Sequence, residues 1–486
     1  MRSLSTLGIS AAALALLAGC VVGPNYSPPA APKVGVYQRA PLASLRPGRG
    51  EPAQRLVSGK AIPAAWWSLF RSTPLNRLVR EALSGSPTIQ AARARLAAAR
   101  QSVVVARGAF YPQLDAAAFA EREKGPPFAT GLLHPRRVPT YDLYSLGPTV
   151  GFVPDVFGLT ARRVEEHSAL AQRQADELAA AQLSVTGNVV VEALTIASVR
   201  LQLHAIESVV KDDKQNLALV KQQFTAGRVD RSDVALAEAR LASDRVPLPA
   251  LEQQLAAAND ALALLVGESP GAWTPPAFTL GDFMLPPDVP LSLPSALVHQ
   301  RPDILAAEAE LHASSAAVGV ATGRLYPTLT LSAALAPTSL TPAALFDGSN
   351  LDWNLLSGLT APLFHGGALR AQRQAAVETF RAALATYRET VLEGLRQVAD
   401  TLQALEHDTE LVGDEHRALD ATHQALELER IRYAAGKVDL LRLLDAERSY
   451  QEARVGYVRA RAARYLDSAD LLVALGGGLQ PSSLRQ

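Results

Sequence analysis

Residues 323–335 read GRLYPTLTLSAAL, and residues 108–114 read GAFYPQL. The two segments share a glycine, a Tyr-Pro pair and a leucine at the same spacing, about 210 residues apart. Two further pairs recur in the same order: SPTI at 86–89 with RPDI at 301–304, and FTAGRVD at 224–230 with YAAGKVD at 433–439. Three ordered matches indicate a tandem duplication, in which each half builds the same unit.

Each half predicts the same order of elements. A short helix precedes a helix that starts at a proline; two strands follow, and then a very long helix that turns at a glycine and returns. The predicted helices are 74–84, 87–107 and 232–265 in the first half, and 294–300, 302–322 and 439–474 in the second. The predicted strands are about 111–121 and 144–153, then about 325–335 and 352–364. We therefore place the two repeats at 63–274 and 275–479, with 480–486 as a flexible tail.

The strands show period-2 patterning. Leu329, Leu331, Ala333 and Leu335 alternate with small or polar residues, and the better segments run about ten residues. One apolar face and one small polar face are typical of a transmembrane barrel strand. A strand at the edge of a soluble sandwich alternates in the same way, so this alternative stays open.

The long helices add a second constraint. From Leu159 to Phe224 the chain has no proline and one glycine, Gly187. At 1.5 Å per residue this segment predicts a helix about 100 Å long, far beyond a globular helix. Leu203, Val210, Leu217 and Phe224 recur every seven residues and predict a coiled-coil seam. An ordinary coiled-coil scaffold would explain these helices, but not the paired strands.

Together the strands and helices predict a mainly α protein with a membrane β-barrel. An open sheet in lipid would leave backbone groups unpaired, each at a cost of several kcal/mol. Four strands cannot close a barrel, because known barrels start at about eight. Separate chains must therefore share one barrel. Two chains would give eight strands and three would give twelve, and the residues alone leave that choice open.

The N-terminus predicts export and lipidation. Arg2 precedes an apolar run from Leu7 to Ala18, which is typical of a signal peptide spanning residues 1–19. The run ends in Leu-Ala-Gly before Cys20, the only cysteine, which predicts cleavage and acylation there. A free or intermolecularly paired thiol is the alternative. Residues 20–62 are proline-rich and are predicted to form an extended, lipidated tether with little regular structure.

Composition argues against several other classes. Lys plus Arg and Asp plus Glu number 47 each, so the absence of net charge gives no support to a nucleic-acid partner. The nine histidines form no metal-spaced cluster, and no phosphate loop or nucleophile elbow is found. We expect no catalytic residue, no metal and no cofactor beyond the covalent lipid. No later segment has about 18 uninterrupted apolar residues, so no membrane-spanning helix is expected.

The sequence resembles the TolC/OprM-like outer-membrane factors, in particular their NodT-like lipoprotein branch, over nearly the whole mature chain. The marks that carry the resemblance are GPNY at 23–26, WWSLF at 66–70, RPDI at 301–304, the Tyr-Pro strand starts and LLDAER at 443–448. The resemblance implies a homotrimer with a twelve-strand outer-membrane barrel that continues into a twelve-helix periplasmic α-barrel. It also implies docking to a periplasmic adaptor and to an inner-membrane pump, proton-driven in this branch.

The resemblance also suggests where the channel narrows. Asp445 matches an acid that lines the constriction in relatives, and three copies would form a carboxylate ring favouring cations. Arg442 stands three residues before it, where some relatives have a second acid; an Arg442–Asp445 surface pair is the alternative role. Tyr433 matches an aromatic gate position, although a core tyrosine is an equal alternative. A further departure is Pro154, which is expected to kink the passage from strand to helix.

The two glycine turns predict helical hairpins, each with a glycine leaving the helix and an aspartate able to cap the next one. The resemblance implies that these tips contact the adaptor. The tip residues are Gly227, Arg228, Val229 and Asp230, and Gly436, Lys437, Val438 and Asp439.

The function expected from the resemblance is a passive exit duct for drugs or other small molecules. An exit duct of a type I protein secretion system shares the architecture and remains an alternative. A periplasmic scaffold lipoprotein without a pore is the alternative of a different class.

Overall fold

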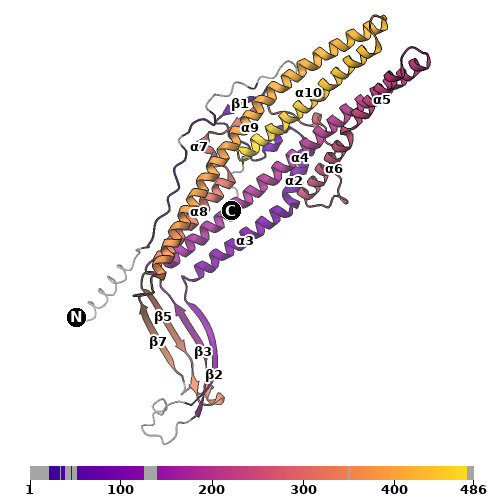
Figure 1. Ribbon diagram of the computed structural model, residues 1–486. Helices are drawn as coiled ribbons and strands as arrows, with labels where there is room; N and C mark the ends of the chain where they lie inside the picture. Colours follow the sequence, from indigo (N-terminus) through magenta and orange to yellow (C-terminus); the bar gives the residue numbers. More distant parts are fainter. Residues whose placement is uncertain are drawn as a thin grey trace, which may run out of the picture. The chain divides into compact units, whose positions relative to one another are not determined.

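The computed structural model describes residues 21–32, 34–38, 45, 52–124, 140–348 and 351–478. The same order of elements occurs twice along the chain (Figure 1). The first copy comprises α2 (Thr73–Gly85), α3 (Pro87–Gly108), β2 (Gln113–Lys124), β3 (Thr140–Phe152), α4 (Leu159–Thr225), α5 (Arg231–Arg245) and α6 (Pro247–Val266). The second comprises α7 (Pro294–Leu297), α8 (Pro302–Gly323), β5 (Thr328–Leu335), β7 (Trp353–Thr360), α9 (Ala368–Ala434) and α10 (Leu440–Ala474).

The returning helix of the first copy differs from its prediction. One helix was expected over 232–265, but α5 ends at Arg245 and α6 starts at Pro247. Pro247 has no N–H to donate and its ring would clash with the carbonyl of Ser243. Val246 stays in the helical region and donates to the Ser243 carbonyl at 3.1 Å, so the chain continues with a break instead of a turn. The second copy has no proline in α10, which is continuous.

The chain divides into two compact units, which we describe separately. One unit holds the sheet, with the helix segments 97–108, 159–173, 308–323 and 368–386. The other holds most of the two helical hairpins, together with the short helices and the described parts of 29–96.

The sheet has the order β2-β3-β5-β7 and is antiparallel throughout (Figure 1). The two repeats meet where β3 pairs with β5 over only four residue pairs, from Thr149 with Ala334 to Phe152 with Leu331. A short strand, β6 (Thr338–Ser339), also pairs with β3. Within the described chain, no strand pairs with the outer edge of β2 or of β7.

The register places the predicted apolar positions on one face of this sheet. Leu114 pairs with Val150, which pairs with Ala333, which in turn pairs with Leu355. Because side chains alternate along a strand, one face carries Leu114, Leu146, Val150, Leu329, Leu335, Trp353, Leu355 and Leu359. Six of these are exposed: Leu114, Leu146, Leu335, Trp353, Leu355 and Leu359. The opposite face carries mostly small or polar residues such as Thr149, Thr330 and Ser332, with Phe119, Tyr141, Leu143 and Leu356 as larger exceptions.

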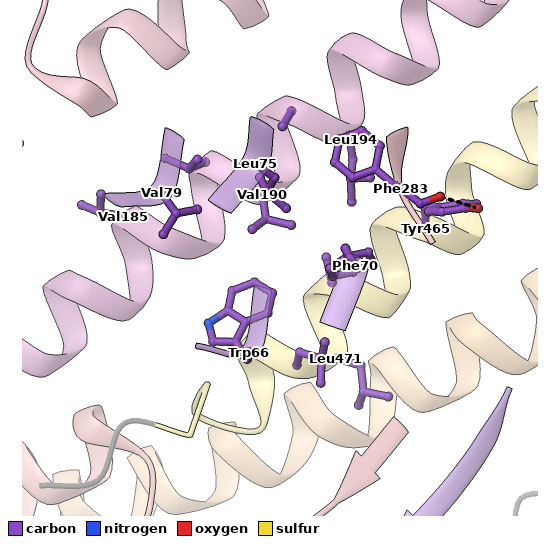
Figure 2. Packing of buried hydrophobic residues seen from close by; sticks show 14 of the residues in the cluster. Trp66, Phe70, Leu75, Val79, Val185, Val190, Leu194, Phe283, Tyr465 and Leu471 are labelled. Carbon is purple, nitrogen blue, oxygen red and sulfur yellow. Dashed lines mark hydrogen bonds between the residues drawn. The ribbon is translucent and has the colours of Figure 1, made fainter. Parts of the chain in front are cut away.

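The core of the second unit joins both repeats (Figure 2). Trp66 and Phe70, from the 3₁₀ turn η1 (Trp66–Phe70), are fully buried. They cluster with Leu75 and Val79 of α2, Val190 and Leu194 of α4, and Leu471 of α10. The WWSLF segment therefore contributes aromatic core side chains where α2, α4 and α10 converge.

The proline-rich segment is partly ordered against this unit, contrary to a free tether. Its residues Arg55–Ser58 form β1, which pairs in parallel with β4 (Asp288–Leu291). The buried Arg464 of α10 donates from Nη2 to the Pro52 carbonyl at 2.8 Å and from Nε to Gln54 Oε1 at 3.1 Å. Further up the chain, the Tyr37 hydroxyl donates to the Ser292 carbonyl at 2.9 Å. These partners lie more than two hundred residues away, which is why composition alone predicted a tether.

The long helices follow the sequence closely, with one difference in the seam. Val210 is buried and Leu203 packs beside it against Leu251, but Phe224 is 45% exposed. A stretch of α4 is long and apolar enough to cross a membrane, yet 56% of it is buried inside the protein. The core helix of a soluble protein meets the same criterion, so this stretch does not by itself indicate a membrane span.

Replacing Trp66 by Ala should destabilise the helical unit by about 3–5 kcal/mol, because the change opens a cavity where two repeats meet. Trp67→Ala is the matched control, since Trp67 is only partly buried and should cost clearly less. Thermal or urea unfolding followed by circular dichroism measures both. Equal losses would contradict the placement of Trp66 in the centre of the core.

Candidate functional site

The two helical turns have the same backbone geometry. Gly227 has φ +68° and Gly436 has φ +67°, a region that glycine enters without strain. In each turn, the amide after the glycine donates to a carbonyl five residues back: Arg228 to Gln223 and Lys437 to Arg432, both at 2.9 Å. This is a Schellman ending, which satisfies carbonyls that the helix leaves open.

The helices that follow are capped by acids. Asp439 Oδ1 accepts from the Arg442 amide at 3.0 Å, so this carboxylate caps α10. In the first turn, Asp233 Oδ2 accepts from the Asp230 amide at 2.9 Å. A negative charge at a helix N-terminus is favourable because the helix dipole is positive there.

A cleft of about 770 Å³ brings residues of both hairpins together. It combines the first tip, the inner side of α5 and the start of α10. Its charged lining residues are Arg228, Asp230, Asp233, Arg240, Asp244, Asp439, Asp445, Arg448 and Glu452. The tip and constriction residues predicted from the sequence that line the cleft are Gly227, Arg228, Val229, Asp230, Asp439 and Asp445. Those that do not line it are Arg442, Tyr433, Gly436, Lys437 and Val438.

Asp445 is exposed on α10 and is not clamped by Arg442. Although both residues lie in the described part of the chain, no ion pair joins them, so the alternative surface pair is absent from this structure. The charge of Asp445 acts instead on Arg448: it raises the pKa of that guanidinium, after the larger effect of the hydrogen bond from Arg448 Nε to Glu452 at 2.8 Å. Asp445 is therefore an exposed acid in the lining of the cleft.

Tyr433 links the two long helices near their turns. Its hydroxyl accepts a hydrogen bond from Gln223 Nε2 at 2.8 Å, and its side chain is half-buried. It is neither a simple core tyrosine nor a cleft residue, because its polar end ties α9 to α4.

Two of the lining residues, Arg240 and Asp244, form a charged cluster with the buried Asp213. Asp213 of α4 is 5% exposed and lies 3.3 Å from Arg240 Nε of α5. Arg240 also donates from Nη1 to the Leu444 carbonyl of α10 at 2.6 Å, and it lies 3.7 Å from Asp244. Burial, followed by a hydrogen bond with Asp244, raises the pKa of Asp213 to about 7, against the opposing charge of Arg240. Three helices thus meet around one guanidinium and two carboxyls.

Comparison with known proteins identifies the class. The family described as "Outer membrane efflux protein" matches residues 78–268 and 293–477. The chain belongs to the outer membrane efflux protein family. The two matched segments correspond to the two halves of the chain, which confirms the duplication.

Relatives and solved structures agree over nearly the full length. The pyoverdine export outer membrane protein OpmQ of Pseudomonas aeruginosa is 32% identical over 90% of this chain and 93% of its own. The probable outer membrane lipoprotein SilC of Salmonella typhimurium is 27% identical over 98% of this chain and 99% of its own. The structure of the outer-membrane channel OprN superposes with a TM-score of 0.85 at 29% identity, covering 95% of this chain and all of the other.

The protein is therefore an outer-membrane channel of an efflux system, with a helical extension in the periplasm, and it is not an enzyme. Among the residues that the structure describes, no three His, Cys, Asp or Glu side chains gather as a metal site. His416 and His423 of α9 lie against Tyr457 and Tyr450 of α10, each with ring centroids 5.3 Å apart. These two histidines thus contact the hairpin partner instead of lying on a wholly solvated face.

The sequence does not single out several buried or half-buried polar residues of the helical hairpins. Asp213 stands in the run KDDK at 211–214, which reads as a solvated helix face. Arg240 has no motif around it, and neither does Asn216, whose amide donates to Glu447 at 2.7 Å. Only the packing of α5 and α10 against α4 removes these side chains from water.

In this efflux channel, Asp213→Asn should make the hairpin more stable at pH 8 and change little near pH 4. The raised pKa means that Asp213 contributes stability fully below about pH 4, and that this stability is lost as pH rises through about 7. Asparagine imitates the protonated acid, so it should raise the unfolding temperature at pH 8 by about 2–4 °C. Asp212→Asn, on the adjacent and more exposed position, is the control. An equal shift at both pH values would contradict a buried charge.

Proposed function

We propose that three copies of this channel close one barrel of twelve strands, continued across the periplasm by a tunnel of twelve helices. The observation that carries the proposal is the open, four-stranded sheet with a register-aligned apolar face. In lipid the free edges of β2 and β7 must pair, and the partner with a matching edge is another copy of the chain. Two copies would leave little lumen, whereas three give a usable pore.

The channel is passive, so its energy must come from partners. We propose a periplasmic adaptor that docks at the two helical tips, and an inner-membrane pump, proton-driven, behind it. The tips suit this role because both end in exposed turns of the same backbone geometry, with Arg228 and Lys437 at corresponding positions. The cargo proposed is a small organic molecule, in keeping with the name of OpmQ as a pyoverdine exporter.

The constriction is proposed at Asp445. The carboxylate is exposed, lies in the second turn of α10, and has no ion pair with Arg442. Three such carboxylates around one axis would favour cations and resist anions. Arg442 follows the cap of α10 and would lie one turn nearer the tip, where it can oppose the ring. Tyr433 would hold the hairpins together through its bond with Gln223.

The lipid is proposed on Cys20, which lies outside the described residues. The support is the sequence Leu-Ala-Gly-Cys together with the relative named as a probable outer membrane lipoprotein. Acyl chains there would add an anchor to the barrel.

Purified protein in planar bilayers should give discrete conductance steps, and Asp445→Ala should raise the leak and reduce the preference for cations. The reason is that removing the carboxylates removes the negative ring. Asp414→Ala, at an exposed acid on α9, is the control and should leave selectivity unchanged. Absence of steps in the wild type would refute the channel, and unchanged selectivity in Asp445→Ala would place this residue outside the lumen.

Cys20→Ser should abolish incorporation of labelled palmitate, because the thiol that carries the acyl group is gone. Barrel insertion should persist, since it depends on the strands. The label is followed on the purified protein after growth in radiolabelled or alkyne palmitate. Label that remains in the variant would show that Cys20 is not the acylated residue.

A further inference from the structure

Residues that directly follow Cys20 are held in a built site of the sheet-bearing unit. Arg162, in the first turns of α4, is only 4% exposed at its side chain. Its Nε donates to the Val22 carbonyl at 3.1 Å, and its Nη2 donates to Asn25 Oδ1 at 2.7 Å and to the Gly23 carbonyl at 3.3 Å. One buried guanidinium therefore binds three oxygens within four consecutive residues.

The other side of the guanidinium is fixed as well. Arg162 Nη1 donates to Glu165 Oε2 at 2.7 Å, and the second oxygen of Glu165 lies 3.0 Å from His312 Nε2 of α8. The His312 ring stacks on Tyr26, with centroids 4.2 Å apart and planes 11° from parallel. The chain between Val22 and Tyr26 thus lies between a charge-assisted hydrogen-bond network and a stacked ring pair.

The backbones of Gly23 and Gly319 approach each other so closely that neither position has room for a side chain. Gly23 has φ +96°, and a Cβ there would lie 2.5 Å from the Cα of Gly319 in α8. A Cβ on Gly319 would in turn lie 2.8 Å from the Arg162 side chain. The Val22 amide adds a backbone bond to the Phe157 carbonyl at 3.1 Å, in the passage between β3 and α4. That passage is itself stiffened by Asp155, whose carboxylate accepts from the Thr160 and Ala161 amides at 2.8 and 2.7 Å.

We propose that Arg162 is the positioning residue of a rigid mount, formed by Val22–Tyr26 on α4 and α8, for the lipid-bearing end of the mature chain. The proposal rests on the acylation of Cys20 proposed above. The lipid is then attached to a segment locked beside the strand-to-helix junction, instead of hanging on a flexible proline-rich linker. The partner of the lipid is the membrane leaflet that borders this junction. A force on the lipid is then transmitted through the segment to the start of α4.

Hydrogen exchange of the mature full-length protein in detergent tests the mount. The Val22 amide should be protected in the wild type, and Arg162→Ala should speed its exchange by at least about tenfold, since three of the segment's bonds are lost. Arg162→Lys should recover little, because an ammonium cannot reproduce the planar fork. Arg163→Ala, at the next residue of the same helix, is the matched control and should leave the exchange unchanged.

Variants of Asn25 test whether the effect of Arg162→Ala comes from the lost contact or from a general disturbance of α4, because Asn25 lies outside this helix. Asn25→Leu should also speed exchange, whereas Asn25→Asp should keep the protection, because the carboxylate still accepts from Arg162. Protection unchanged in both Arg162→Ala and Asn25→Leu would overturn the mount.

The Cys20→Ser variant tests whether the mount depends on the lipid. Retained protection of the Val22 amide in this variant supports a mount built from side chains, and lost protection would overturn it in favour of a segment held by the lipid alone. A wild-type protein that carries no palmitate but keeps the protection would overturn the acylation and leave the mount standing.

Discussion

Every strand has hydrogen-bonding groups along two edges, and among the residues that the structure describes β2 and β7 use only one edge each. The same strands belong to a sheet whose register gathers leucine, valine and tryptophan on one face. Such a sheet can face lipid only if its edges are paired, because hydrocarbon offers no partner for a backbone N–H or C=O. The proposed sharing of one pore by several copies rests on this constraint. Along the chain, each pair of strands is followed directly by one of the long helices.

Away from the sheet, a recurring device holds distant segments together. Four buried or half-buried arginines each donate to a backbone carbonyl far away in sequence: Arg162 to Val22, Arg240 to Leu444, Arg301 to Ala474 and Arg464 to Pro52. A guanidinium suits this task because it offers five N–H donors in a fixed plane. Carbonyls near helix ends and in irregular segments have spare acceptor capacity. In this way the protein joins its repeats and its N-terminal segment without a large aromatic core at each junction.

The duplicated halves are not equivalent, and several of the differences lie in the helical hairpins. Pro247 breaks the returning helix of the first half, whereas α10 runs unbroken through the second. The first hairpin also contributes the buried Asp213 and Arg240, while the second contributes the exposed Asp445 and the tyrosine that bonds Gln223. Tandem units that diverge in this manner can take different roles: here the first half supplies a buried charged contact, and the second supplies the acid of the proposed constriction.

The duplication was readable because the two copies keep the same residues in the same order. The strand alternation, the proline-free helices and the glycine turns were readable because each depends on residues close together in the chain. Local steric and hydrogen-bonding preferences determine such features, so GRLYPTLTLSAAL and the paired FTAGRVD and YAAGKVD segments were sufficient. Tertiary structure decided the rest. It turned the described part of the expected tether into a docked segment, left Arg442 and Asp445 without an ion pair and buried Asp213 out of a run that reads as solvated. Those outcomes depend on which distant side chains meet and which lose their water, and no local pattern encodes that.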